Sequence, residues 1–133
     1  MKTYDPTEVQ VNVGALTLTG FASDTFVEIS RKTTERYKTK VGAQGEVSRS
    51  KVSDKSGTIQ VTLKHTSPCN AKLYQMDKLP TTFPITVIEN GESKFMAVSS
   101  VAWIEKTPDP KFGVEEGDAV WVFACADLNY NQI

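Results

Sequence analysis

The chain has 133 residues and a mass of 14.7 kDa, with 15 basic and 16 acidic side chains and an ordinary hydrophobic fraction of 39%. This length suits one domain, residues 1–133, with one core, and the balanced charge excludes general nucleic-acid affinity, which needs a basic excess. The longest apolar run, Ala119–Ala126, is too short to span a membrane and no signal peptide is seen, so we expect a protein made and kept in the cytoplasm.

Alternating apolar and polar residues predict β-strands over the first half of the chain. The pattern predicts a hairpin that begins at Val9 and ends at Gly20, a strand over 26–31 and a second hairpin over 37–52. Two glycines in the turn of the second hairpin allow positive φ. The clearest amphipathic strand follows at 58–64, where Ile59, Val61 and Leu63 share one face.

The period then changes to that of a helix. Ser67 as N-cap and Pro68 at the first helical position predict the start of one short helix, over about 68–79, which Pro80 ends. Its expected apolar face consists of Ala71, Leu73, Met76 and Leu79.

Strands return beyond the helix. Residues 83–89 and 94–104 flank Asn90-Gly91, a strong signal for a two-residue hairpin turn, and residues 120–128 form an interior strand. A proline- and glycine-containing loop of about a dozen residues precedes this last strand and is long enough to suggest a function. The expected fold is mainly β, an antiparallel β-sandwich or rolled barrel with one short α-helix.

Charge is distributed unevenly along the chain. Residues 28–64 carry nine bases and four acids, a net charge of +5, whereas the flanking segments 1–27 and 65–133 carry −2 and −4. A basic middle and acidic flanks make the chain complementary to a second copy of itself. Heterologous contacts of this kind close into rings or continue as filaments, so self-assembly is a serious hypothesis.

Few residues suit catalysis or metal binding. Cys69 near the helix start and His65 upstream form the available nucleophile-and-base pair. Nothing evident orients the histidine, so we interpret Cys69 as a small first-turn residue and His65 as a strand end facing solvent. Cys69 and Cys125 are expected to be free thiols. One histidine and two distant cysteines do not make a metal site, and the acidic run at 115–118 lacks the spacing of a calcium loop. We therefore expect no catalytic residue, metal or cofactor.

The basic hairpin leaves a second class of function open. A monomeric β-barrel could bind nucleic acid or another ligand through this region, although single-strand binders offer several stacking aromatics and the hairpin offers only Tyr37. An acidic partner surface, including that of another copy, fits these charges better.

Several strings resemble a specific family, the small tail tube proteins of contractile-tailed bacteriophages, over Tyr4 to about Leu128. The strings are Thr39–Glu46, Arg49, Asp54–Ile59, Thr66–Asn70 and the late strand with Trp121, Cys125 and Asp127. The Val-Gly-x-x-Gly-Glu turn followed by the Asp-x-Ser-Gly turn is the more specific part.

The resemblance implies a role in a virion tail that is assembled in the host bacterial cytoplasm. Six copies would form a ring whose sheets join around a lumen, and stacked rings would conduct DNA without binding it specifically. The implied partners are the chain itself and the sheath, baseplate and tail terminator proteins. An inner tube of a DNA-free system, bacteriocin or type VI-like, is the alternative with the same fold.

The resemblance also suggests roles for particular residues. A lumen wall should be polar and neutral to acidic, and Lys64 on the same face as the lumen candidates fits less well. Lumen-facing candidates are Glu28, Thr58, Gln60 and Thr62. Candidates for ring stacking, in and beside the second hairpin, are Lys38, Lys40, Gly42, Gly45, Glu46, Arg49, Lys51 and Asp54.

Overall fold

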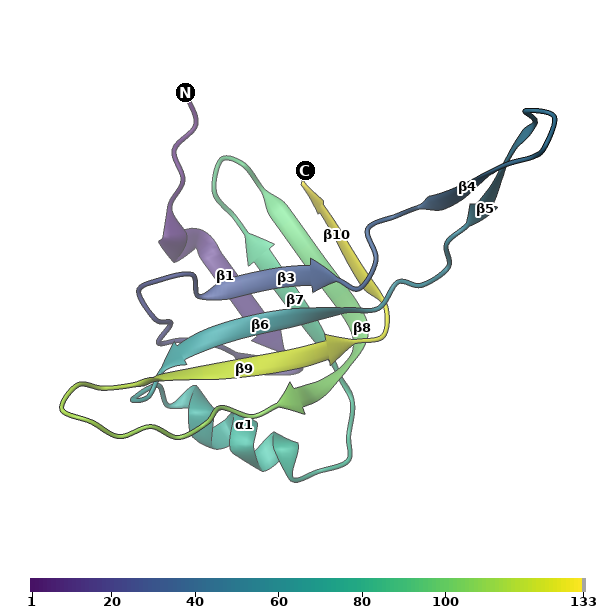
Figure 1. Cartoon of the computed structure of the whole chain (residues 1–133). Helices are drawn as coiled ribbons and strands as arrows, with labels where there is room; N and C mark the ends of the chain where they lie inside the picture. The colour runs from purple at the N-terminus through teal and green to yellow at the C-terminus, as the bar shows by residue number, and fades with distance from the viewer. Residues whose placement is uncertain (133) are drawn as a thin grey trace.

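The structure is a computed structural model that describes residues 1–132 (Figure 1). A short 3-10 turn, Pro6–Glu8, precedes the first strand. The strands and the α-helix that follow are β1 Val9–Val13, β2 Leu16–Thr17, β3 Val27–Arg31, β4 Tyr37–Val41, β5 Val47–Lys51, β6 Gly57–Lys64, α1 Cys69–Asp77, β7 Phe83–Glu89, β8 Phe95–Lys106, β9 Asp118–Cys125 and β10 Leu128–Gln132.

One antiparallel sheet makes up the body, in the order β2-β1-β7-β8-β9-β6-β3, with β10 paired to the first part of β8. The sheet folds over on itself, so that β3, β6 and β9 form a front layer across β1, β7, β8 and β10 behind it (Figure 1). The long strand β8 belongs to both layers because it pairs with β7 and β10 near its start and with β9 near its end. The predicted antiparallel β fold with one short helix is confirmed.

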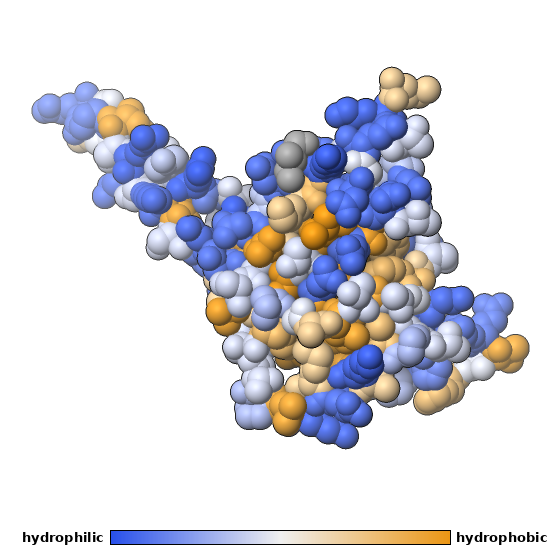
Figure 2. Space-filling model, turned by 180° about the vertical axis from the view of Figure 1, so that it is seen from behind, coloured by the Kyte–Doolittle hydropathy of each residue, from blue (hydrophilic) through white to orange (hydrophobic). Residues whose placement is uncertain are grey.

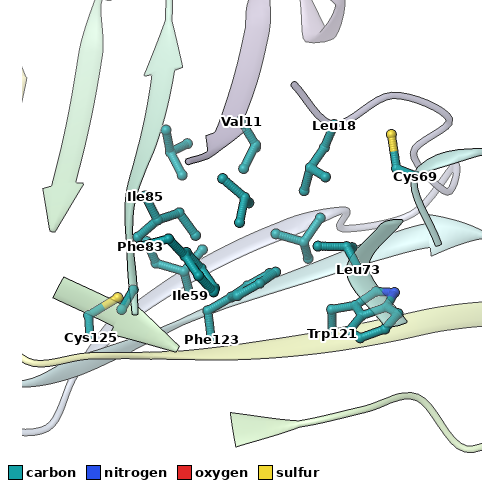
Figure 3. Close-up of a cluster of buried hydrophobic side chains, with 14 of the residues drawn as sticks. Val11, Leu18, Ile59, Cys69, Leu73, Phe83, Ile85, Trp121, Phe123 and Cys125 are labelled. Carbon is teal, nitrogen blue, oxygen red and sulfur yellow. The ribbon is translucent and has the colours of Figure 1, made fainter. Parts of the chain in front are cut away.

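The core fills the space between the two layers. Alternation along β6 turns Ile59, Val61 and Leu63 inward, and β9 adds Trp121 and Phe123, all fully buried (Figure 3). These side chains meet residues of the back layer, and the rings of Phe83 and Phe123 pack edge to face with centroids 6.1 Å apart. Cys69 and Cys125 are both buried free thiols, as predicted.

Gly57 allows the sheet to pack tightly where β6 begins. A Cβ at this position would lie 2.6 Å from the carbonyl oxygen of Ser30 and 2.6 Å from Cδ2 of Leu128. Strands β6 and β9 pair without interruption from Gly57 opposite Cys125 to Lys64 opposite Asp118. This register determines which side chains share each face of the front layer.

The helix differs from the prediction in its bounds and its buried face. It begins at Cys69, with Pro68 rather than Ser67 at the N-cap, and ends at Asp77. The Ser67 hydroxyl instead donates to the Thr19 carbonyl at 2.6 Å, which ties the helix start to the chain after β2.

The predicted apolar helix face is largely wrong. Leu73 is buried, but Met76 is half-buried and both Ala71 and Leu79 are exposed. Asn70 takes a buried place instead, because its side chain accepts a hydrogen bond from Trp121 Nε1 at 2.9 Å and donates to the Lys64 carbonyl at 2.9 Å. The orientation of the helix is therefore set partly by a polar pair.

Two strand predictions are also corrected. The turn between β7 and β8 spans residues 90–94 rather than two residues, and within it the Lys94 N–H donates to the Gly91 carbonyl at 3.4 Å. On the other side, the Asn90 N–H donates to the Glu8 carbonyl at 3.0 Å and extends the ladder with the segment before β1. The predicted strand 120–128 is two strands, β9 and β10. The chain turns at residues 126–127, where the Ala126 N–H donates to the Val101 carbonyl, and Leu128 then pairs with Ser99 of β8.

Candidate functional site

The hairpin β4–β5 projects from the body where β3 ends and β6 begins (Figure 1). Every residue of its two strands is exposed, and within residues 1–132 these strands pair only with each other. Residues 32–36 and 52–56 connect it to the body. A two-stranded hairpin alone is marginally stable in water, and the body of the subunit does not cover this one.

The register of the hairpin separates its two faces. Tyr37, Thr39 and Val41 pair with Lys51, Arg49 and Val47 on one face. On this face the Arg49 guanidinium lies 4.2 Å from the centre of the Tyr37 ring, and Val41 and Val47 near the turn are 64% and 67% exposed. The opposite face carries Lys38, Lys40, Ser48 and Ser50. Figure 2 shows this mixture as orange groups among blue ones along the projection.

The turn and the base of the hairpin have defined conformations. Gly45 adopts a φ of +87°, which favours glycine, whereas Gly42 does not use positive φ. The Gly42 N–H donates to the Glu46 carbonyl at 2.7 Å and closes the hairpin. At the base, the Asp54 carboxylate accepts the Ser56 hydroxyl at 2.7 Å and the Ser56 N–H at 3.0 Å, which lowers the pKa of Asp54. The structure thus gathers the eight hairpin candidates in this projection and its base.

The four lumen candidates lie together on the outer face of the front layer. Glu28 of β3 is opposite Gln60 of β6, and Thr58 and Thr62 flank Gln60 on the same side of β6. Their inward neighbours on β6 are core residues, so these four side chains face away from the core. The four residues therefore share one polar surface on β3 and β6, as the sequence pattern suggested.

The other half of the same face is apolar, which sequence reasoning missed. Val120 and Val122 of β9 are opposite Thr62 and Gln60, and Ala124 lies between Thr58 and Trp103 of β8. The signal was present, because residues 120–128 are apolar on both faces of the predicted strand. The long-range register that joins this run to β6 was not predictable from it. The same register puts Lys64 opposite Asp118, so the lysine has an acidic cross-strand neighbour.

The front layer has two unpaired edges. β3 is the terminal strand of the sheet, and within residues 1–132 no strand pairs with its outer edge. Residues 103–106 of β8 pair with β9 on one side, while β7 reaches only as far as Ala102 on the other side. Beside β3 lies a groove of about 540 Å³ lined by apolar side chains of both layers, including Ile29, Val87 and Phe95.

The catalytic interpretation of Cys69 gains no support from the geometry. Its thiol is buried and lies 3.6 Å from the Thr17 carbonyl oxygen, whereas His65 is exposed and packs against Phe112. Burial raises the pKa of the other thiol, Cys125. Among residues 1–132 no three His, Cys, Asp or Glu side chains are grouped as metal ligands. No helix in the same range has the length and apolarity to cross a bilayer.

Comparison with protein families decides the identity. Residues 14–131 match the model of the bacteriophage PhiTE tail tube protein family. The chain belongs to this family. It is thus a structural component of a phage-type tail, and the resemblance that the sequence motifs suggested is confirmed. A comparison with curated proteins found no match.

Solved structures share the fold at low sequence identity. The sheath/tube terminator of the extracellular contractile injection system PVC is 13% identical, with a TM-score of 0.71 over 98% of both chains. The tube-terminating cap of the anti-feeding prophage is 12% identical, with a TM-score of 0.71 over 100% of this chain and 93% of that one. A chain of the PVC sheath-tube complex is 13% identical, with a TM-score of 0.66 over 98% and 93%. These similarities are evidence of a common fold.

Proposed function

We propose that six copies of the chain form a ring, that the rings stack into a hollow tube inside a contractile sheath, and that this tube conducts DNA into the host. The observation that carries the ring is the pair of unpaired edges on the front layer. An unpaired edge presents backbone donors and acceptors that a strand of another copy can satisfy.

The strand directions favour this joining of edges. The four strands β3, β6, β9 and the end of β8 alternate in direction because each neighbouring pair is antiparallel. The two outer strands, β3 and β8, therefore run in opposite directions. When the end of β8 of one copy lies beside β3 of the next, the pair is antiparallel and the pattern repeats in every subunit. The neighbour would also cover the apolar groove beside β3.

The outer face of the front layer has the charge that a DNA conduit needs. Glu28 and Asp118 contribute two negative charges to this face, and Lys64 and Lys106, which is opposite Val122, contribute two positive charges. Thr58, Gln60 and Thr62 supply neutral polar groups. A polar wall with no basic excess does not retain the phosphate backbone. We therefore assign Glu28, Thr58, Gln60 and Thr62 to the lumen.

The projecting hairpin is assigned to ring stacking. Its cations Lys38, Lys40, Arg49 and Lys51 extend beyond the body, together with two exposed valines. Gly42, Gly45 and Glu46 shape its turn, and Asp54 holds its base. In this proposal, sheath, baseplate and tail terminator proteins cover the remaining outer surfaces in a particle assembled in the host cytoplasm.

A tube of a DNA-free injection system is the second candidate. It is supported by the similar solved structures, which are parts of an extracellular contractile injection system or of an anti-feeding prophage. Extraction of nucleic acid from purified particles separates the two candidates, since the conduit role requires genomic DNA in them.

Negative-stain microscopy and light scattering of the purified protein, at low and moderate salt, test the assembly. We expect six-fold rings or hollow tubes. Particles that stay at the subunit mass of 14.7 kDa at every concentration would contradict self-assembly. In the variant Arg49→Glu/Lys51→Glu, rings should persist while stacking into tubes weakens. Unchanged tubes in this variant would remove the stacking role of the hairpin cations.

A proline in β3 tests the joined edges. The Lys32 N–H donates to the carbonyl of Ser56, the residue before β6, and so points toward β6. Successive N–H groups along an antiparallel strand point to alternate sides. The Val27 N–H, five residues earlier, therefore points to the outer edge of β3. Val27→Pro should block ring closure because proline has no N–H to donate. The control Glu28→Pro removes a bond to β6 and should lower the melting temperature. Rings formed normally by a folded Val27→Pro protein would rule out this edge.

A further inference from the structure

The loop between β8 and β9, residues 107–117, presents two large apolar side chains that the body does not cover. Phe112 is 83% exposed and Val114 is fully exposed. The loop nevertheless has a fixed shape. Glu116 accepts the Thr66 N–H at 2.8 Å, Phe112 and Glu116 form a β-bridge, and the Phe112 ring meets His65 edge to face with centroids 5.5 Å apart. These contacts hold the apolar pair in a defined position.

The charge of this loop is opposite to that of the hairpin. Residues 107–117 contain Asp109, Glu115 and Glu116 against Lys111, a net charge of −2. The hairpin, residues 37–51, contains four cations and one acid, a net charge of +3. Each of the two elements thus combines an exposed apolar pair with an excess of one sign of charge.

The loop and the hairpin lie at opposite ends of the front layer. The hairpin leads into Gly57 at the start of β6, and the loop leads into Asp118, which is opposite Lys64 at the end of β6. The eight residues of β6 separate these ends, a distance of about 23 Å at 3.3 Å per residue. Figure 1 shows the two elements extending from the body in opposite directions. A copy displaced along these strands therefore brings its loop toward the hairpin of its neighbour.

We propose that the hairpin of one copy docks on the β8–β9 loop of a copy in the next ring. Val41 and Val47 pack against Phe112 and Val114, while Arg49 and Lys51, the cations on the same face as the valines, lie toward Asp109 and Glu115. The two surfaces differ, so the contact is heterologous and repeats from ring to ring. This inference rests on the stacking role proposed for the hairpin and adds the surface that receives it.

Disulfide trapping tests the contact directly. Val47→Cys and Val114→Cys proteins are mixed under assembly conditions and oxidised. The native cysteines are buried and do not compete. We expect covalent dimers in the mixture and a ladder of longer species from the double variant. The matched control pairs Val47→Cys with Val101→Cys, an exposed valine of β8 remote from the loop, and should give no dimer.

A charge exchange provides a second test that does not depend on cysteine. Glu115→Lys should shorten or abolish tubes, and Arg49→Glu in the same chain should restore them. If tubes form normally, no disulfide joins positions 47 and 114, and Glu115→Lys has no effect, the loop is not the receiving surface. That result would not contradict the stacking role of the hairpin. Wild-type protein that forms neither rings nor tubes would overturn the proposed function as well.

Discussion

The strand β6 and the hairpin β4–β5 follow one another in the chain and use the same alternating pattern, with opposite results. The apolar residues of β6 are completely buried by the protein's own helix and sheets, whereas the apolar residues of the hairpin remain in solvent. The local pattern makes a strand in both places. Burial is supplied within the subunit for β6, whereas in the proposed tube a neighbouring subunit supplies it for the hairpin. Variants that separate folding from assembly test this comparison.

The largest effect on folding is expected for Trp121→Ala. The side chain is fully buried and its Nε1 donates to Asn70, so truncation leaves a cavity and an unpaired buried acceptor. We expect a loss of about 3–5 kcal/mol in the free energy of unfolding, measured by chemical denaturation. The matched control is Trp103→Ala, because Trp103 is 41% exposed. A loss of equal size in both variants would contradict the core described here.

Two glycine variants should give the next largest difference. Gly57→Ala places a Cβ against the Ser30 carbonyl and Leu128 and should cost about 1–3 kcal/mol of body stability. Gly45→Ala meets no atom within 4 Å but must adopt a φ of +87°. Its strain stays within the hairpin, so the melting temperature of the body should not change. A lowered melting temperature for Gly45→Ala would show that the hairpin and the body unfold together.

Polar replacement of the hairpin valines should affect assembly and spare folding. Val41→Ser/Val47→Ser changes side chains that are exposed in the subunit, so the free energy of unfolding should stay within about 0.5 kcal/mol. Tubes seen by negative-stain microscopy should disappear, because the surface that covers these valines loses its apolar contact. Val98→Ser, at an exposed position on β8, is the control for any loss of exposed valine.

The smallest effect is a pH response at the base of the hairpin. Hydrogen bonds from Ser56 lower the pKa of Asp54 below its ordinary value of 3.8. Because the folded-state pKa is the lower one, the stabilisation is complete above the unfolded value and is lost as the pH falls through the folded value. The Ser56 amide resonance should therefore shift at a lower pH than the titration of an ordinary aspartate would give. In Asp54→Ala this titration should vanish, and a shift that persists would assign it to another group.

The sequence predicted the fold where local pattern and burial agree. Strand β6 and the hairpin followed from alternation and turn residues alone. The helix face did not, because the hydrogen bond between Asn70 and Trp121 buries a polar residue that a search for apolar periodicity passes over. The turn at residues 126–127 contains neither glycine nor proline, so Asp127 was the one local signal for the division between β9 and β10.

The candidate site shows the same limit. The hairpin residues are contiguous in sequence, and the polar outer face of β6 can be read from alternation. The apolar half of that face comes from β8 and β9, and only the register between distant strands joins it to β6. The unpaired edges likewise depend on the strand order of the whole sheet, which no local segment specifies.

The hairpin connects to the body through two short segments and contributes no side chain to the core. The fold of the body therefore places little constraint on the sequence of the hairpin, and in the proposed tube the constraint comes from the subunit that receives the hairpin. Its sequence can therefore diverge quickly between lineages as long as the opposing surface changes with it. In such an assembly, a few paired changes of this kind would prevent two related tubes from mixing their subunits without any change in the core.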